Sequence, residues 1–128
     1  MTDAPAPKRL LVVEDDPTCA RLLRDALRTR YDVQVEGDGF TALERARQDP
    51  PDLLLLDLHL PTLSGFDVMA QWRQDPDLSA CPIVVVSARV MQGEQKRARA
   101  QGCHAFVTKP FSLQELRSAV ADALGESD

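Results

Sequence analysis

The sequence is poor in the residues that build disulfide frameworks and zinc sites. Its three cysteines, Cys19, Cys81 and Cys103, are odd in number, lie far apart and form no C-x-x-C pair. They are typical of small apolar side chains in a reducing compartment, and a redox-sensing role has little support. The two histidines, His59 and His104, have no partner at metal-ligand spacing, which argues against a zinc site.

Long hydrophobic runs and an excess of positive charge are also absent. No segment approaches the roughly 20 apolar residues of a membrane-spanning helix, and the N-terminal MTDAPAPKR lacks the apolar core of a signal peptide. We therefore expect a cytoplasmic protein without a membrane partner. Lys and Arg number 15 against 20 Asp and Glu, a formal net charge of -5, so direct binding to nucleic acid is not expected.

The residues that are present fit one domain. A chain of 128 residues with 44% hydrophobic residues can build one well-packed core. The Pro/Ala-rich residues 1–7 are expected to form a mobile leader and residues 8–125 the domain. Residues 126–128 are expected to form a short tail after Gly125, since glycine commonly ends a helix.

Five apolar runs alternate with helical patterns along the chain. The runs cover residues 9–13, 31–35, 52–56, 82–86 and 105–108. The first helix is predicted over residues 17–30, with Asp16 as its N-cap and Pro17 at its first position. Its buried face is predicted to carry Ala20, Leu23 and Leu27.

The last helix begins with SLQE, which predicts a capping box of Ser112 and Glu115, and Leu113, Leu116 and Val120 follow at core spacing. Strands that alternate with helices need crossover connections, and strands that are apolar throughout need helices on both faces. The sequence therefore predicts an α/β fold, a doubly wound five-stranded parallel sheet. Ligands bind such sheets at the carboxyl ends of the strands, where the strand order reverses.

Polar residues stand at these predicted strand ends. They are Glu14, Asp15 and Asp16 after the first strand, Asp57 after the third, Ser87 after the fourth and Lys109 after the fifth. Each alone is typical of a solvated loop or, for Asp16, of a helix cap, whereas the whole set rarely arises by chance. Converging carboxylates repel unless they are protonated or share a cation, and oxygen ligands beside one lysine suit Mg²⁺.

Five motifs resemble the response-regulator receiver domain of bacterial two-component signalling. They are LLVVEDDP at 10–17, GDGFTAL at 37–43, LLLLDLHLPTLSG at 53–65, VVVSAR at 84–89 and FVTKPF at 106–111. The resemblance covers nearly the whole chain and implies the flavodoxin-like strand order 2-1-3-4-5. The segment MQGEQKRARAQGCHAF is similar to that of single-domain regulators and of receivers attached to hybrid kinases.

The resemblance also implies a role for each strand-end residue. The phosphoacceptor is Asp57, the acidic pair is Glu14 and Asp15, the switch residues are Ser87 and Phe106, and the phosphoryl-binding lysine is Lys109. Mg²⁺ is implied as cofactor, held by Asp15, Asp57 and the backbone carbonyl of His59, with Glu14 acting through water. The Lys109-Pro110 peptide is expected to be cis.

Three positions depart from the common pattern of the family. His59 and Arg89 occupy the positions that tune dephosphorylation in this family, so they leave the lifetime of the phosphoryl group open. Gly37 stands where alanine is common, and little consequence is expected. Phe106 lacks the hydroxyl of the tyrosine found in many relatives, so a switch at this position must work by burial alone.

The resemblance implies a regulator that accepts a phosphoryl group on Asp57 from a sensor histidine kinase or a histidine phosphotransfer protein. The resemblance further implies that the chain is not an enzyme beyond its own phosphorylation and dephosphorylation. It also implies signalling to a downstream protein through the fourth helix, fifth strand and fifth helix. A hydrolase that forms an aspartyl phosphate is the main alternative, but it needs an aspartate where His59 stands. A flavin or dinucleotide binder shares the fold but not the G-x-G-x-x-G motif, and a phosphorylation-independent binding module does not need the acid, hydroxyl and lysine set.

Overall fold

A computed structural model describes residues 6–88 and 93–126 of the chain. Its centre is a sheet of five parallel strands in the order β2-β1-β3-β4-β5, as the sequence predicts. The strands are β1 Arg9–Val13, β2 Asp32–Glu36, β3 Leu53–Leu56, β4 Ile83–Ser87 and β5 Ala105–Thr108.

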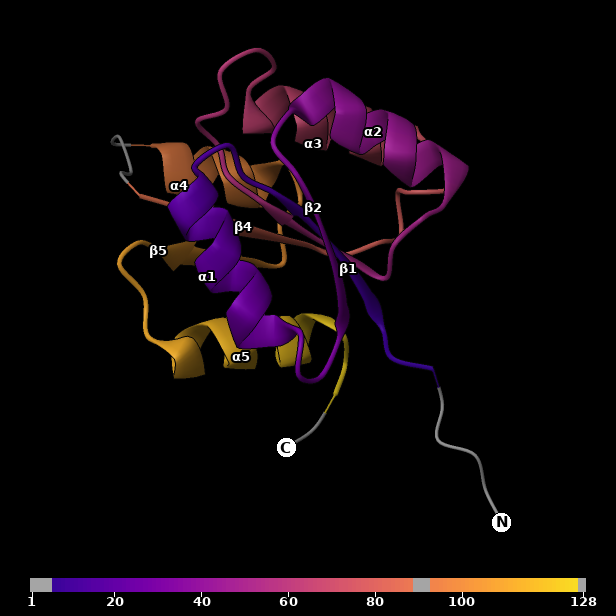
Figure 1. Ribbon diagram of the computed structural model, residues 1–128. Helices are drawn as coiled ribbons and strands as arrows, with labels where there is room; N and C mark the ends of the chain where they lie inside the picture. The colour runs from indigo at the N-terminus through magenta and orange to yellow at the C-terminus, as the bar shows by residue number, and fades with distance from the viewer. Residues whose placement is uncertain (1–5, 89–92, 127–128) are drawn as a thin grey trace.

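One helix follows each strand, and the helices cover both faces of the sheet. They are α1 Pro17–Leu27, α2 Gly39–Gln48, α3 Gly65–Gln74, α4 Glu94–Ala100 and α5 Leu113–Ala123. Figure 1 shows α1 and α5 on one face and α2 and α3 on the opposite face. Among the described residues, no helix has the length and apolar character that crossing a bilayer requires.

The leucine strand β3 lies in the middle of the sheet and serves both faces. Leu53 and Leu55 belong to the apolar cluster beneath α1 and α5, whereas Leu54 and Leu56 belong to the cluster beneath α2, α3 and α4. All four side chains are at most 1% exposed. At about 1.5 to 3 kcal/mol for each fully buried leucine, this strand is a large contribution to stability. It also fixes the position of the residue that follows it, Asp57.

The first helix begins as predicted and ends three residues early. The Asp16 side chain accepts a hydrogen bond from the backbone N–H of Thr18 at 3.2 Å, which confirms the N-cap. The helix ends at Leu27 rather than at residue 30, and the backbone N–H groups of Arg30 and Tyr31 both donate hydrogen bonds to the Leu27 carbonyl. This turn brings Tyr31, which is 6% exposed, into the α1/α5 cluster.

The last helix has the predicted capping box but not the full predicted core face. Ser112 and Glu115 bond each other's backbone N–H groups, and Leu116 and Val120 are fully buried. Leu113 is 43% exposed, so its assignment to the core was wrong. It is the first residue of α5, one turn before Leu116, and the buried cluster begins only at Leu116.

Candidate functional site: an acidic pocket at the carboxyl edge of the sheet

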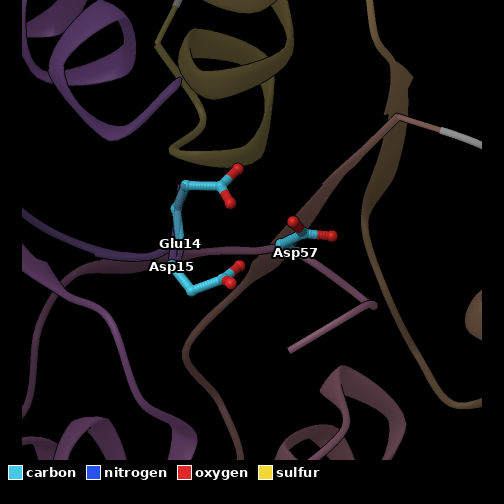
Figure 2. A group of neighbouring side chains, drawn as sticks. All are labelled: Glu14, Asp15 and Asp57. Atoms are coloured by element: carbon cyan, nitrogen blue, oxygen red, sulfur yellow. The ribbon is translucent and has the colours of Figure 1, made fainter. Parts of the chain in front are cut away.

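Three carboxylates meet where the strand order reverses, between β1 and β3. Glu14 and Asp15 follow β1, and Asp57 follows β3 (Figure 2). One oxygen from each carboxylate lies within 4.8 Å of the others. The backbone N–H of Asp57 donates to the Val13 carbonyl at 3.1 Å, so the pairing of β1 and β3 holds the ends of these two strands side by side.

Asp57 is the central carboxylate of this pocket and is 7% exposed. Its Oδ1 accepts a hydrogen bond from the backbone N–H of His59 at 3.0 Å and lies 3.5 Å from the Ser87 hydroxyl. Its Oδ2 lies 3.4 Å from Nζ of Lys109. The two oxygens therefore face different partners, a hydroxyl on one side and an ammonium on the other.

Lys109 bridges two of the carboxylates, because its Nζ also donates to Oε1 of the buried Glu14. Burial opposes its charged form, but the hydrogen bond to Glu14 and the nearby Asp57 outweigh burial and raise the pKa of Lys109. The lysine follows β5, and its backbone N–H donates to the Ser87 carbonyl at 2.8 Å. The peptide after it, Lys109-Pro110, is cis, as predicted.

Glu14 is the most buried acid of the pocket, at 3% exposed. Burial raises the pKa of Glu14, although the hydrogen bond from Lys109 acts in the opposite direction. Its Oε2 accepts the backbone N–H of Asp16 at 3.2 Å. The thiol of Cys19 lies against this group, and burial together with Glu14 raises the pKa of Cys19 to about 11.

The pocket carries more negative than positive charge. Among the described residues, Lys109 is the only cation paired with these acids, and it contacts Glu14 and Asp57, whereas Asp15 is exposed to solvent. Carboxylate oxygens that converge on a solvent-open position are the donor set that a hard divalent cation such as Mg²⁺ prefers. The residues present therefore fit this ion.

Ser87 and His59 extend the pocket toward α4. Ser87 is the last residue of β4 and is fully buried, and its Oγ lies 3.3 Å from Nδ1 of His59. The other ring nitrogen, Nε2, lies 3.1 Å from Oε2 of Glu94, the first residue of α4. The sequence gives no signal for Glu94, because it is 35 positions from His59 and follows no strand.

The loop after Asp57 depends on a glycine. A Cβ at Gly65 would lie 2.5 Å from the backbone oxygen of Asp57 and 2.6 Å from Cα of Leu58. The N–H of Gly65 donates to the Leu58 carbonyl at 2.9 Å. No side chain fits this close approach, so Gly65 shapes the loop that presents Asp57.

One predicted site residue, Phe106, stands apart from this contact network. Phe106 is half-buried and packs against the α2/α3/α4 cluster. It pairs with Val85, two residues before Ser87, and therefore lies on the same face of the sheet as Ser87. Arg89 lies outside the described residues.

The fold and the pocket define a flavodoxin-like domain with an acidic, cation-binding type of site at the switch point of its sheet. The family model of the response regulator receiver domain matches residues 10–121. The chain therefore belongs to the response regulator receiver family.

Its relatives include both signalling proteins and solved receiver structures. The polar-differentiation response regulator DivK of Brucella anthropi is 34% identical over 122 residues, which are 94% of this chain and 99% of the relative. The phosphorylated cyanobacterial phytochrome response regulator RcpA is 31% identical, with a TM-score of 0.79 over 91% of each chain. The receiver domain of a sensor histidine kinase from Pseudomonas aeruginosa, solved with magnesium in its active-site cleft, is 28% identical. Its TM-score is 0.87 over 94% of this chain and all of that one.

Proposed function

We propose that this receiver domain accepts a phosphoryl group on Asp57 from a sensor histidine kinase or a histidine phosphotransfer protein. The observation that carries the proposal is the environment of this carboxylate, which lies at the end of β3 with Oδ1 toward Ser87 and Oδ2 toward Lys109. A carboxylate attacks phosphorus efficiently only where charge is neutralised and the reacting groups are aligned.

In the transfer step, a carboxylate oxygen of Asp57 forms a bond to phosphorus as the P–N bond of the donor's phosphohistidine breaks. The electron pair of that bond stays on the leaving imidazole. Lys109 lies beside Oδ2 and neutralises negative charge on the transferring group, and Ser87 donates its hydroxyl hydrogen to a phosphoryl oxygen. The same residues serve the chain's own dephosphorylation, and no other catalysed reaction is proposed.

Mg²⁺ is the proposed cofactor. Asp15, Asp57 and the backbone carbonyl of His59 are its proposed ligands, and Glu14 is proposed to act through water. When bound, the ion supplies further neutralisation of the transferred charge. The excess of carboxylates over cations in the pocket supports this assignment, and a divalent ion would also be expected from the magnesium-bound relative.

The test is the intact mass of the protein after incubation with acetyl phosphate and Mg²⁺. We expect the wild type to gain one phosphoryl group and Asp57→Asn to gain none. Asp52→Asn, which changes the acid just before the same strand, is the matched control and should be labelled like the wild type. Full labelling of Asp57→Asn would remove the basis of the proposal. Sustained release of phosphate from a phosphomonoester, rather than stoichiometric labelling, would favour a hydrolase.

His59 and Arg89 are proposed to set the lifetime of the phosphorylated form. The His59 ring lies between Ser87 and Glu94 at the edge of the pocket, and we expect the hydrolytic water to approach on this side. Replacing both residues by alanine should change the decay rate of phosphorylated protein, measured as loss of the phosphoryl mass. Superimposable decay curves would show that neither residue acts on hydrolysis.

Output is proposed to occur by contact between α4, β5 and α5 and a downstream protein. Among the described residues, the α4 cations Lys96, Arg97 and Arg99 form no ion pair, and Arg97 lies 4.0 Å over the ring of Phe66. An acidic partner surface suits these charges. Reversing Lys96 and Arg99 to glutamate should weaken binding to the target more than reversal of Arg21 on α1, and equal losses would argue against this face.

A cytoplasmic location is proposed as well, which the three free cysteines support.

A further inference from the structure

The side chain of His59 connects the phosphoryl site to the first residue of α4. Its Nδ1 lies 3.3 Å from the buried Ser87 hydroxyl, and its Nε2 lies 3.1 Å from the Glu94 carboxylate. The Glu94 side chain is 18% exposed, so water screens this contact only in part. One ring thus touches both the residue that faces Asp57 and the start of a helix.

The chemistry of the partners assigns the hydrogens of this bridge. A carboxylate can only accept, so Nε2 of His59 carries the hydrogen that bonds Glu94. In the neutral ring Nδ1 is then an acceptor, and it accepts a hydrogen bond from the Ser87 hydroxyl. Asp57 Oδ1 is a charged acceptor, but at 3.5 Å from the same hydroxyl it lies well beyond the usual O–H···O distance of about 2.5 to 3.0 Å, so Nδ1 is the better placed acceptor. The hydroxyl of Ser87 has one hydrogen, so it can donate to only one of these two acceptors at a time.

We propose that His59 is a positioning residue that holds the Ser87 hydroxyl in the resting protein and ties its position to the N-terminal end of α4. This inference rests on the proposed phosphorylation of Asp57. A phosphoryl group brings charged acceptor oxygens, which form stronger hydrogen bonds than a neutral ring nitrogen. On phosphorylation, the Ser87 hydroxyl turns to the phosphoryl group and no longer donates a hydrogen bond to Nδ1 of His59. The His59 ring then loses one of its two contacts, and its contact with Glu94 weakens.

The helix that receives this change is weakly anchored. Ala98 is the only buried residue of α4, and the N-cap, Gly93, makes no side-chain capping bond. The described part of α4 thus has little buried packing of its own, and the His59–Glu94 contact is one of the interactions that hold its first turn. Loss of one such hydrogen bond should raise local opening by roughly two- to tenfold.

The experiment is amide hydrogen exchange of residues 94–100 in the full chain, first without phosphorylation. Glu94→Ala should raise exchange there roughly two- to tenfold. His59→Asn should do the same, because its short amide can still bond Ser87 but cannot reach Glu94. His59→Gln, whose longer side chain reaches Glu94, should restore slow exchange. Combining Glu94→Ala with His59→Asn should add nothing to either single change.

The second measurement repeats the series after incubation with acetyl phosphate and Mg²⁺, with phosphoryl uptake followed by mass. Phosphorylated wild type should exchange in 94–100 like resting Glu94→Ala, and Glu94→Ala should take up phosphate without further change in exchange. His104→Ala is the matched control, since His104 forms a similar exposed pair with Asp122 at 3.0 Å before β5, at the opposite edge of the sheet.

Two results overturn the inference. Resting Glu94→Ala that exchanges like the wild type would show that the contact does not hold α4, and additive effects of the two substitutions would show that they act separately. Both readings come from unphosphorylated protein. They are therefore distinct from failure of the proposed function, which would appear as absence of phosphoryl uptake in the wild type.

Discussion

Replacing Lys109 by methionine should destabilise the protein strongly at neutral pH in the absence of divalent ions. The ammonium lies between two buried acids, Glu14 and Asp57, and is 3.4 Å from Oδ2 of the latter. With an effective dielectric constant near 20, two unit charges at this distance attract by about 5 kcal/mol. Removing one partner of such a buried group typically costs about 3 to 5 kcal/mol, because the remaining charge is left uncompensated.

The loss should depend on pH in a direction set by Glu14. Burial already raises the pKa of this acid, and removing Lys109 takes away the interaction that opposes the rise. Between the usual glutamate pKa, about 4.3, and the raised value, the native protein binds a proton that the unfolded chain does not. The free energy of unfolding of the variant therefore falls as pH rises through this window, and acidification toward its lower end restores stability.

Urea unfolding of wild type and Lys109→Met at about pH 5 and pH 7 measures both effects. Lys96→Met is the matched control, because Lys96 is an exposed α4 lysine without an ion pair among the described residues. Added Mg²⁺ should recover part of the loss, since the ion would replace the missing positive charge. If Lys109→Met were as stable as Lys96→Met at neutral pH without metal, the electrostatic account of the pocket would be refuted.

Three further changes probe separate parts of the site. Asp15→Ala should lower the rate of phosphoryl uptake about tenfold at limiting Mg²⁺, with recovery at high Mg²⁺; uptake that is insensitive to excess chelator would contradict a metal role. Gly65→Ala should lower the free energy of unfolding by about 1 to 3 kcal/mol in urea, whereas Gly37→Ala, whose Cβ would lie 3.8 Å from its nearest neighbour, should cost much less. Ser87→Ala should leave Asp57 able to accept phosphate but abolish the exchange response of residues 94–108; a full response in this variant would exclude coupling through the hydroxyl.

The fold was predictable because its signals are local and repeated. The strands β1, β3 and β4 are short, mostly apolar runs, and β3 is apolar on both faces because two separate clusters cover it. The pocket was predictable for a related reason, since residues that follow parallel strands meet at one edge whatever their distance along the chain. This rule brings Glu14, Asp57 and Lys109 together across up to 95 positions.

The remaining features depend on contacts that no local pattern encodes. Leu113 has the spacing of a core residue, but its burial depends on where the cluster beneath α5 begins. The early end of α1 depends on the burial of Tyr31. The contact between His59 and Glu94 joins two partly exposed side chains, one on the loop after β3 and the other at the start of α4. The sequence marked His59 through its place after Asp57, but no local pattern marked Glu94 as its partner.

The division of the core by β3 has a consequence for how this protein can diverge. Within residues 6–88 and 93–126, the cluster beneath α1 and α5 shares no buried side chain with the cluster beneath α2, α3 and α4, so the sheet separates two independently packed layers. Substitutions on opposite faces should therefore add in their effects on stability. Mutations that retune α4 for a new partner need compensation only within their own layer. The residues of the other layer can stay unchanged. The same fold can therefore evolve a new partner-binding surface on one face while the core of the other face is conserved.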